Sequence, residues 1–324
     1  MAEDEVVPEA LRPTPEQLDF DLDLALGSIV TIRSEVPADA FTAGVLGTER
    51  TGSGVVIARK GLILTIGYLI TEAETIWLTT RDGRALPGAV MGSDQATGFG
   101  LVQALGRLDL PAFSFGSVRN LRRGSRVVVA GQGGRPTALL ATVAGKQEFA
   151  GYWEYLIDEA LFTRPAHPSW GGAACIDLSG HLVGIGSLLI QTEPAEGDDE
   201  ANGNMIVPID LLPPVMDDLM RYGRPNRPPR PWLGMYTADT AKRPVVVGLA
   251  SDGPADSAGV EVGDMVVEVA GEDIEDLADM LRRVWSLGDA GVEIPLTVIR
   301  DGEPLGLRVR SADRDRFLKQ PPLH

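Results

Sequence analysis

The residues of this chain with the clearest chemical potential lie in the stretch 163–172, which reads TRPAHPSWGG. His167 lies two residues before Ser169, and paired glycines follow. A serine attacks a carbonyl carbon when a base takes its hydroxyl proton and a carboxylate orients that base. Side chains two apart in an extended segment point the same way, so contact between His167 and Ser169 is sterically allowed. Pro168 and the lack of an adjacent carboxylate leave the histidine without an orienting partner, so we expect His167 to pack within the loop.

Other residues able to support catalysis or to bind a metal are scarce. Of the remaining histidines, His181 sits in a Ser-Gly-His turn and His324 is the last residue. Cys175, the single cysteine, lies in the apolar run 173–176, so we expect a buried small hydrophobic residue and no intrachain disulfide. The acids in 193–200 lack the ligand spacing of a calcium loop, and we expect neither a metal nor another cofactor.

The charge and the apolar segments of the chain indicate which partners and which cellular location to expect. With 29 basic and 46 acidic residues the net charge is −17, which argues against electrostatic binding of nucleic acid or of an anionic membrane. The longest apolar run, 61–70, is far shorter than the roughly 20 residues of a transmembrane helix, so we expect no membrane span. The acidic amino terminus, MAEDEVVPEA, lacks the succession of basic, then apolar, then small residues that marks a secretion signal. We therefore expect a cytoplasmic protein, with the periplasm as the alternative if a leader has been removed.

The 324 residues allow about two domains, and the first half of the chain is rich in β-strand signals. Residues 1–26 are acidic and contain several prolines, so we expect a mobile amino-terminal arm. Residues 27–222 carry short β-branched runs about every ten residues, typical of an all-β barrel or sandwich, and end in a helical pattern over 210–222. The expected strands include 28–32, 54–58, 63–65, 75–79, 126–130 and 182–186.

A second domain follows a proline-rich segment. The run YGRPNRPPRP favours extended polyproline geometry, and we place a stiff linker at 223–230. Residues 231–312 alternate strand patterns with one strong helical pattern over 277–285, as expected of a small α/β module. We assign 313–324 to a carboxy-terminal tail.

Several motifs of the β-rich region match one family. The segments TGSGVVI at 51–57 and GLILT at 61–65 precede the pair Gly171 and Gly172. In these features the chain resembles the HtrA (DegP-like) family of serine proteases. The resemblance implies a mostly β fold in which a chymotrypsin-like double β-barrel is followed by a PDZ domain.

By this resemblance, all three positions of the catalytic triad hold other residue types. The family's histidine loop, Thr-Asn-Asn-His-Val-Val, corresponds to TIGYLI, which places Tyr68 at the position of the general base. The family's Thr-Asp-Ile-Ala-Leu corresponds to TGFGL, which places Gly98 at the position of the aspartate. Alignment of the paired glycines puts Trp170 at the serine position, and Ser169 takes that position only if the register slips by one residue.

These replacements predict the loss of proteolysis. A phenol with a pKa near 10 is a poor proton acceptor at neutral pH, and glycine has no side chain. The resemblance implies an oxyanion hole built from the backbone N–H of the nucleophile and of the residue two before it, which here is Pro168 and has no N–H. Loss of a whole triad lowers turnover about a millionfold in a measured serine protease.

The second domain carries its own motifs. The segment PWLGM at 231–235 resembles the Gly-Trp-Leu-Gly-Val loop that opens the PDZ domain of the family, and GPADSAGV at 253–260 and GDMVV at 263–267 resemble two further PDZ motifs. Such a domain binds an extended peptide as an added strand, while backbone N–H groups of the opening loop bind a terminal carboxylate. Its helix faces the last side chain of the peptide, although core packing is the alternative for the leucines. The peptide-binding residues expected here are Trp232, Leu233, Gly234, Met235, Leu277 and Leu281.

Three functional hypotheses follow. The first, which we favour, is a proteolytically inactive HtrA-like homologue that binds peptides or protein C-termini through its PDZ domain, as an adaptor, chaperone-like or regulatory subunit in protein quality control. The second is an active HtrA-type serine endopeptidase with an unusual site around Ser169. The third is a structural subunit of an oligomer. The resemblance implies a homo-oligomer, specifically a trimer, or assembly with an HtrA-type partner.

Overall fold

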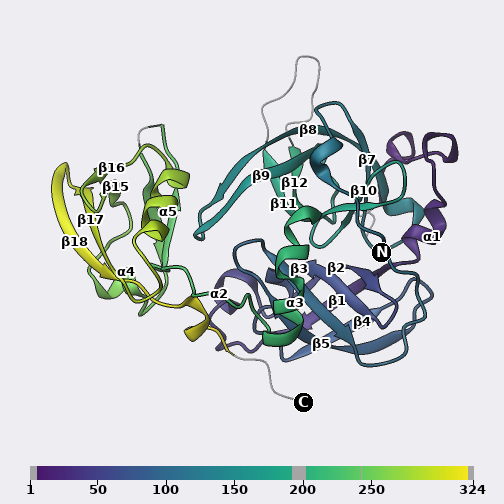
Figure 1. The fold of residues 1–324 in the computed structure, drawn as a ribbon, viewed down its shortest axis with the longest axis horizontal. Helices are drawn as coiled ribbons and strands as arrows, with labels where there is room; N and C mark the ends of the chain where they lie inside the picture. The colour runs from purple at the N-terminus through teal and green to yellow at the C-terminus, as the bar shows by residue number, and fades with distance from the viewer. Residues whose placement is uncertain (1–5, 192–201, 242, 320–324) are drawn as a thin grey trace. The chain divides into compact units, whose positions relative to one another are not determined.

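The computed structural model describes residues 6–191, 202–241 and 243–319, which form two compact units. The first unit holds the described residues of 1–147 and 159–225. The second unit holds 148–158 and 226–319, so one short segment from the middle of the β-rich region belongs with the carboxy-terminal module. Figure 1 shows the course of the chain through both units.

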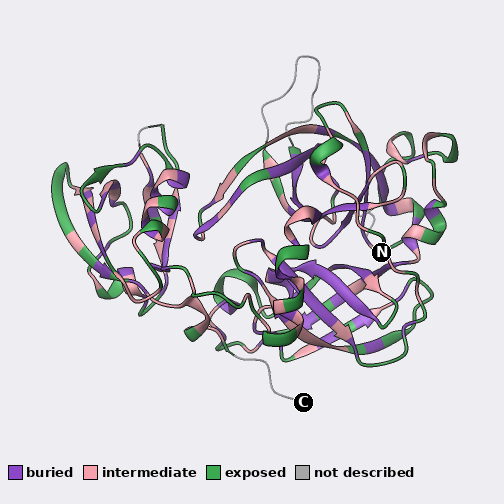
Figure 2. Ribbon diagram, viewed as in Figure 1, coloured by how far each residue is buried: buried purple, intermediate pink, exposed green. Residues whose placement is uncertain are grey.

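Six strands of the first unit close into a barrel with the order β1-β2-β3-β6-β5-β4, in which neighbours are antiparallel. In β1, Val30 and Ile32 point inward and Arg33 points to solvent, because successive side chains of a strand face opposite sides. Many apolar residues of these strands are buried, and Figure 2 marks the buried residues along the ribbon in purple. The strands are β1 (Ile29–Glu35), β2 (Glu49–Ala58), β3 (Leu62–Ile66), β4 (Thr75–Thr79), β5 (Ala85–Ser93) and β6 (Phe99–Ala104).

The other six strands of the β-rich region form a second closed barrel with the order β10-β11-β12-β9-β8-β7. Its interior is a cluster of aliphatic side chains that includes Val127, Leu161 and Ile206. Cys175 belongs to this cluster and has no exposed surface, which confirms the expectation of a buried small hydrophobic residue. The strands are β7 (Arg126–Ala130), β8 (Ala138–Gly151), β9 (Tyr155–Arg164), β10 (Ala174–Ile176), β11 (Leu182–Gln191) and β12 (Asn202–Pro208).

The amino-terminal segment differs from the expected mobile arm over its described part. Val7 is buried in the core cluster of the second barrel, and its backbone N–H donates to the carbonyl of Pro136 at 2.9 Å. Asp21 caps the short helix α1 by accepting a hydrogen bond from the Leu24 N–H. Two apolar residues of α1, Leu22 and Leu26, are buried, which explains why an acidic segment stays packed. The elements are η2 (Glu9–Leu11), η3 (Pro15–Gln17) and α1 (Leu22–Leu26).

The helix expected over 210–222 begins later than its apolar pattern suggests. A 3₁₀ turn, η7, precedes α3, which starts at Pro213 because two prolines there fit the first turn of a helix and not its interior. Gly223 ends α3 in the left-handed conformation, with φ 74°. The remaining elements of this unit are α2 (Ala43–Leu46), η4 (Gly67–Leu69), η5 (Val118–Asn120), η6 (Arg135–Thr137), η7 (Ile209–Leu211) and α3 (Pro213–Tyr222).

The second unit is a small sheet with the order β13-β14-β15-β17-β18, in which β13 is an edge strand. The hairpin of β17 and β18 turns at Asp301 and Gly302, whose φ angles of 52° and 86° suit a tight turn. Helix α5 is capped by Asp276 and buries one apolar face. The elements are β13 (Met235–Ala238), β14 (Val245–Leu249), α4 (Pro254–Ser257), β15 (Met265–Val269), β16 (Glu272–Asp273), α5 (Leu277–Ser286), β17 (Glu293–Arg300), β18 (Glu303–Arg310) and η8 (Arg314–Arg316).

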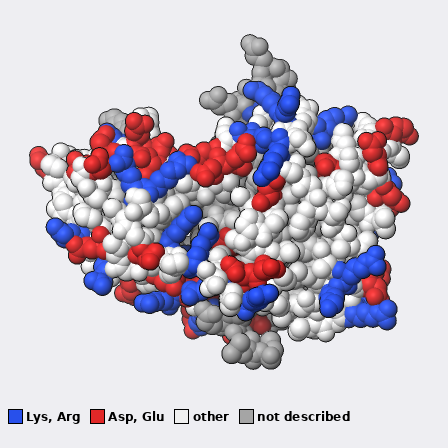
Figure 3. Space-filling view, in the orientation of Figure 1, with Lys and Arg blue, Asp and Glu red and all other residues white. Residues whose placement is uncertain are grey.

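The architecture confirms the expected fold class, since the protein is mostly β and a pair of closed barrels is followed by a small α/β module. Acidic and basic side chains intermingle over the face drawn in Figure 3. Within the described ranges, no helix combines the length and the apolar character that a membrane crossing requires. The acidic segment 193–200, considered above as a calcium loop, lies outside the described residues.

Candidate functional site

Tyr68 lies in the 3₁₀ turn η4, directly after β3. Its hydroxyl donates a hydrogen bond to the backbone carbonyl of Ser187 at 2.9 Å. Burial raises the pKa of this phenol further above its ordinary value of 10, with a smaller opposing effect from a hydrogen bond with the Trp170 side chain. The Tyr68 hydroxyl therefore keeps its proton and joins the η4 turn to strand β11, and it has no proton-accepting role at neutral pH.

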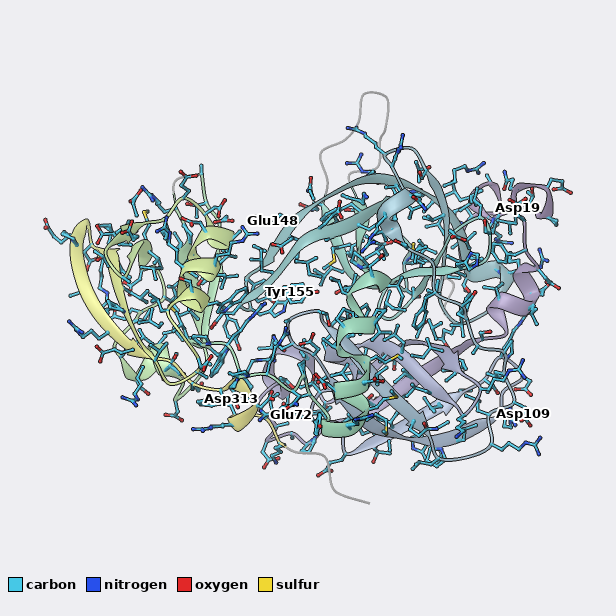
Figure 4. All side chains as sticks on the ribbon, in the orientation of Figure 1. Asp19, Glu72, Asp109, Glu148, Tyr155 and Asp313 are labelled. Carbon is cyan, nitrogen blue, oxygen red and sulfur yellow. The ribbon has the colours of Figure 1, made fainter. Side chains whose placement is uncertain are left out.

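A buried arginine fixes the turn that carries Tyr68. The Arg50 guanidinium donates to the backbone carbonyls of Tyr68 and Thr71 at 2.8 and 2.9 Å, and to the Thr42 hydroxyl at 2.7 Å. Thr42 in turn donates from its N–H and its hydroxyl to the carboxylate of Glu72, which is labelled in Figure 4. Arg50 and Glu72 are both buried, so each is stabilised by this shared network.

Gly98 contributes backbone groups where the resemblance places a carboxylate. Its N–H donates to the Asp94 carbonyl at 2.7 Å, and its carbonyl accepts from the Gly67 N–H at 2.6 Å. With φ 82°, the residue has a conformation that suits glycine and strains an aspartate. Oδ1 of nearby Asp94 accepts from the Ala96 N–H. The loop is thus joined to the Tyr68 turn through the main chain.

The side chain of His167 is fully buried, and both ring nitrogens bond to the backbone. Nε2 lies 2.6 Å from the Thr137 carbonyl, which can only accept, so this nitrogen carries the proton. Nδ1 accepts a hydrogen bond from the Ser169 N–H at 3.1 Å. The backbone N–H of His167 donates to the Asn204 side chain at 2.6 Å. His167 therefore packs in the loop as expected, and its one lone pair is already used.

The paired glycines allow close approaches that a side chain would block. A Cβ on Gly171 would lie 2.9 Å from the Tyr68 hydroxyl, and one on Gly172 would lie 1.9 Å from the Ser53 carbonyl oxygen. The Trp170 carbonyl accepts from the Ala173 N–H at 3.0 Å. The structure therefore brings the Trp170 loop against Tyr68, so the expected nucleophile and base positions meet in space while carrying indole and phenol groups.

Backbone donors of this loop are partly committed to other acceptors. Pro168 has no N–H, and the Ser169 N–H points to the His167 ring. The Gly172 N–H donates to the Gly186 carbonyl at 2.9 Å. A loop that stabilises an oxyanion directs such N–H groups toward the substrate oxygen, and these residues do not.

The opening loop of the second unit holds a carboxylate. Glu154 accepts hydrogen bonds from the N–H groups of Leu233, Gly234 and Met235 at 3.0, 2.7 and 3.2 Å. Leu233 N–H lies equally near both carboxylate oxygens. Burial raises the pKa of Glu154 to about 7, and the three backbone hydrogen bonds and the nearby Arg314 charge oppose that shift. The three N–H groups thus form an anion-binding nest of the kind that binds a terminal carboxylate.

The other residues expected to bind peptide occupy different positions. Trp232 is buried, pairs through its main chain with Ala312, and has its ring centroid 4.8 Å from that of Phe317. Leu277 and Leu281 of α5 are almost fully buried in the module core, which agrees with the packing alternative raised for these leucines. The Asp239 carboxylate accepts from the Leu277 N–H at 2.8 Å and so ties the end of β13 to the start of α5.

Sequence reasoning missed Glu154 altogether. It lies 79 residues before the loop that binds it, in a run of aromatic residues between β8 and β9. Its φ of 61° places it in the left-handed region, which is uncommon for a residue other than glycine. The available signal was a single acid within YWEY, and nothing in that pattern indicates a distant partner.

Comparisons with known proteins match the β-barrel region and the carboxy-terminal module to two domain families. The trypsin-like peptidase domain family matches residues 52–185, and the PDZ domain family matches residues 231–310. A probable periplasmic serine endoprotease DegP-like of Pseudomonas fluorescens is 27% identical over 272 residues, which cover 79% of this chain and 54% of that protein. A probable periplasmic serine protease do/HhoA-like of Haemophilus influenzae is 26% identical over 80% of this chain and 57% of its own length. The chain spans about half the length of the curated relatives it matches.

Solved structures with a similar fold include an HtrA-type protease, AlgW, with a decapeptide. It has a TM-score of 0.53 and 20% sequence identity, and the match covers 94% of this chain and all of that one (100%). The serine endoprotease from Yersinia pestis has a TM-score of 0.50 and 22% identity, with 91% and 98% of the two chains covered. At these identities the likeness concerns the fold.

Proposed function

We propose that this chain, which matches the trypsin-like peptidase domain family over residues 52–185 and the PDZ domain family over residues 231–310, is a proteolytically inactive HtrA-like protein that binds peptides or protein C-termini. In this role it acts as an adaptor, chaperone-like or regulatory subunit. The PDZ loop of Leu233, Gly234 and Met235 is the proposed carboxylate site, because its three N–H groups already converge on a carboxylate.

One observation carries the proposed loss of catalysis. The Tyr68 hydroxyl, at the position proposed for the general base, donates a hydrogen bond to the Ser187 carbonyl, and burial raises the pKa of this phenol. A group that donates in this way cannot take the proton of a serine. Gly98 supplies no carboxylate to orient a base, and Trp170 supplies no nucleophilic atom.

We further propose a periplasmic location and an oligomeric state. The curated relatives are named as periplasmic proteases, which favours the periplasmic alternative over the cytoplasmic placement expected from the amino terminus. Resemblance to the HtrA family supports a homotrimer or assembly with an HtrA-type partner. Sedimentation equilibrium of the purified chain measures this stoichiometry directly.

Casein digestion tests the loss of catalysis. The purified chain and its Ser169→Ala variant should release fragments at the same background rate, because neither contains a base for a serine. A fluorophosphonate probe should label neither protein, since it reacts with activated serines. Cleavage by the natural chain that disappears in Ser169→Ala would contradict the proposal.

An active endopeptidase is the second candidate. It is favoured by the names of the relatives, which are called serine proteases or endoproteases, and by Ser169 beside the paired glycines. The engagement of His167 with the Thr137 carbonyl and the Ser169 N–H argues against it. Fluorophosphonate labelling of the natural chain that is lost in Ser169→Ala is the result this candidate requires.

A further inference from the structure

The turn between β8 and β9 belongs to the same compact unit as the PDZ domain. We call residues 148–158 the hairpin tip; Glu148 and Tyr155 of this segment are labelled in Figure 4. Glu154 of the hairpin tip is 9% exposed, and its carboxylate bonds to all three N–H groups of the carboxylate site. The site is therefore filled by an acid from the same chain.

The hairpin tip also pairs with the strand beside the site. The Thr237 N–H of β13 donates to the Tyr152 carbonyl at 2.9 Å. Since β13 is the edge of its sheet, this bond lies where an added peptide strand would pair. The Tyr152 ring packs edge-on against the Tyr236 ring, with centroids 6.1 Å apart.

The spacing of these contacts matches that of a bound peptide. The residue that supplies the carboxylate, Glu154, lies two positions after Tyr152, whose carbonyl pairs with β13. A peptide whose terminal carboxylate occupied the nest would place its third residue from the end at the position of Tyr152. The hairpin tip thus reproduces both the carboxyl group and the backbone pairing of a carboxy-terminal peptide.

A third group of contacts holds the base of the hairpin tip. Arg282 of α5 forms ion pairs with Glu148 and with Asp158, the latter at 2.6 Å. Ala150 and Leu156 pack against the apolar core of the module. These contacts are separate from the carboxylate site and the β13 pairing beside it. The hairpin tip is therefore attached to the module both at its turn, through Tyr152 and Glu154, and at its base, through Glu148 and Asp158.

We propose that the hairpin tip is an internal ligand of the PDZ domain, and that a protein carboxy terminus with an aromatic residue third from its end binds by displacing it. This inference rests on the proposed function, because it concerns the same peptide site. An aromatic residue is favoured because it would replace Tyr152 against Tyr236. A free terminal carboxylate is required because it must replace Glu154 on three N–H groups.

Competition of this kind lowers the apparent affinity for an external peptide. When the binding-competent state is a fraction of the population, the apparent Kd rises by the inverse of that fraction. If the hairpin tip leaves the carboxylate site open for about one-tenth of the time or less, removal of the Glu154 carboxylate should improve peptide binding about tenfold or more.

The experiment uses the full chain and a fluorescein-labelled hexapeptide, Phe-Ala-Gly-Tyr-Trp-Val, with a free carboxy terminus. The peptide repeats residues 149–153 and ends in a carboxylate at the place of the Glu154 side chain. Fluorescence anisotropy gives the Kd for the natural chain, for Glu154→Ala and for a matched control, Glu159→Ala. Glu159 is an exposed acid of the same hairpin that pairs with Lys146 and lies outside the hairpin tip.

We expect Glu154→Ala to bind the peptide at least about tenfold more tightly than the natural chain and Glu159→Ala. The carboxamide form of the peptide should bind at least about tenfold more weakly to every protein, because it lacks the charge that the nest selects. Arg282→Gln, which leaves the nest intact, should also improve binding by loosening the second attachment. Equal affinity of all variants for the free-acid peptide would overturn the internal ligand and leave peptide binding in place.

A separate measurement covers the case in which no variant binds the peptide, which would contradict the proposed peptide-binding function. Amide hydrogen exchange over 232–237 should then be faster in Glu154→Ala than in Glu159→Ala, because the Leu233, Gly234 and Met235 N–H groups lose their acceptor. Faster exchange would support the internal contact by itself. Unchanged exchange would overturn it.

Discussion

The imidazole of His167 accepts a hydrogen bond from the Ser169 N–H at 3.1 Å, and its other nitrogen donates to the Thr137 carbonyl at 2.6 Å. The histidine that precedes the glycine pair is thus bonded to the main chain on both sides. It determines the shape of the loop, and its ring is not available to a serine hydroxyl.

Replacement of His167 by alanine should destabilise the protein. The change leaves a buried carbonyl without its donor and opens a cavity, so we expect a loss of about 2–4 kcal/mol in the free energy of unfolding. Urea denaturation followed by circular dichroism measures it. His181→Ala is the matched control, because that side chain is 44% exposed. Equal effects of the two substitutions would contradict a packing role for His167.

Arg50→Met should destabilise the first unit strongly. The substitution removes four hydrogen bonds, which the guanidinium makes to Gly47, Tyr68, Thr71 and Thr42. It also leaves Glu72 in a buried network that has lost its cation. Breaking a buried ionic network by removing one partner costs about 3–5 kcal/mol. The control is Arg33→Met, which removes an exposed ion pair with Glu49 and should change stability little. A loss below about 1 kcal/mol for Arg50→Met, measured by urea denaturation, would refute this account.

Gly172→Ala should disrupt the loop that contains Trp170 and the two glycines after it. Its φ is 77°, and a Cβ there would lie 1.9 Å from the Ser53 carbonyl oxygen, which belongs to β2 and is held by the pairing of that strand with β1 and β3. We expect a loss of more than about 3 kcal/mol or a failure to fold. Gly124→Ala separates strain from clash, because Gly124 has φ 88° and open space around its Cβ position. That control should cost about 1–2 kcal/mol, and thermal denaturation compares the two.

The contact made by Glu154 should depend on pH. Burial raises the pKa of Glu154 to about 7 from an ordinary value of 4.5, against the hydrogen bonds of the loop and the Arg314 charge. Burial also raises the pKa of nearby Tyr236 above its ordinary value, so that phenol stays neutral in this range. The folded protein therefore binds more protons than the unfolded chain between these two values, and stability falls as the pH rises from about 4.5 to about 7.

Glu154→Gln removes this titration while keeping the size of the side chain. The difference in unfolding free energy between the natural chain and Glu154→Gln should decline by up to about 1.4 kcal/mol per pH unit within the window, and level off above it. Urea denaturation at half-unit steps from pH 4 to 8.5 measures this difference. A constant difference across that range would show that the pKa of Glu154 is not raised.

Much of the fold could be predicted from local patterns. The β-branched runs at 75–79 and 126–130 coincide with β4 and β7, and the Asp-Gly pair at 301–302, a common hairpin-turn sequence, forms the turn between β17 and β18. These features depend on neighbouring residues, so a short stretch of sequence contains the information. The start of α3 was missed because the two prolines outweigh the apolar spacing before them.

The residue types at the candidate catalytic positions were also readable in advance, since an alignment of motifs is enough to place Tyr68, Gly98 and Trp170. Their surroundings were not readable, because hydrogen-bond partners lie far away in the chain, as Ser187 does from Tyr68. Two other contacts were unpredictable for the same reason, because they also join residues far apart in the chain. Val7 packs into the second barrel, and Glu154 accepts hydrogen bonds from the Leu233 loop. Composition and spacing establish which chemical groups the protein possesses. The tertiary structure decides which of those groups are buried and which come into contact. The contacts join residues more than seventy positions apart, and the sequence of a short segment does not specify which distant residues will lie beside it.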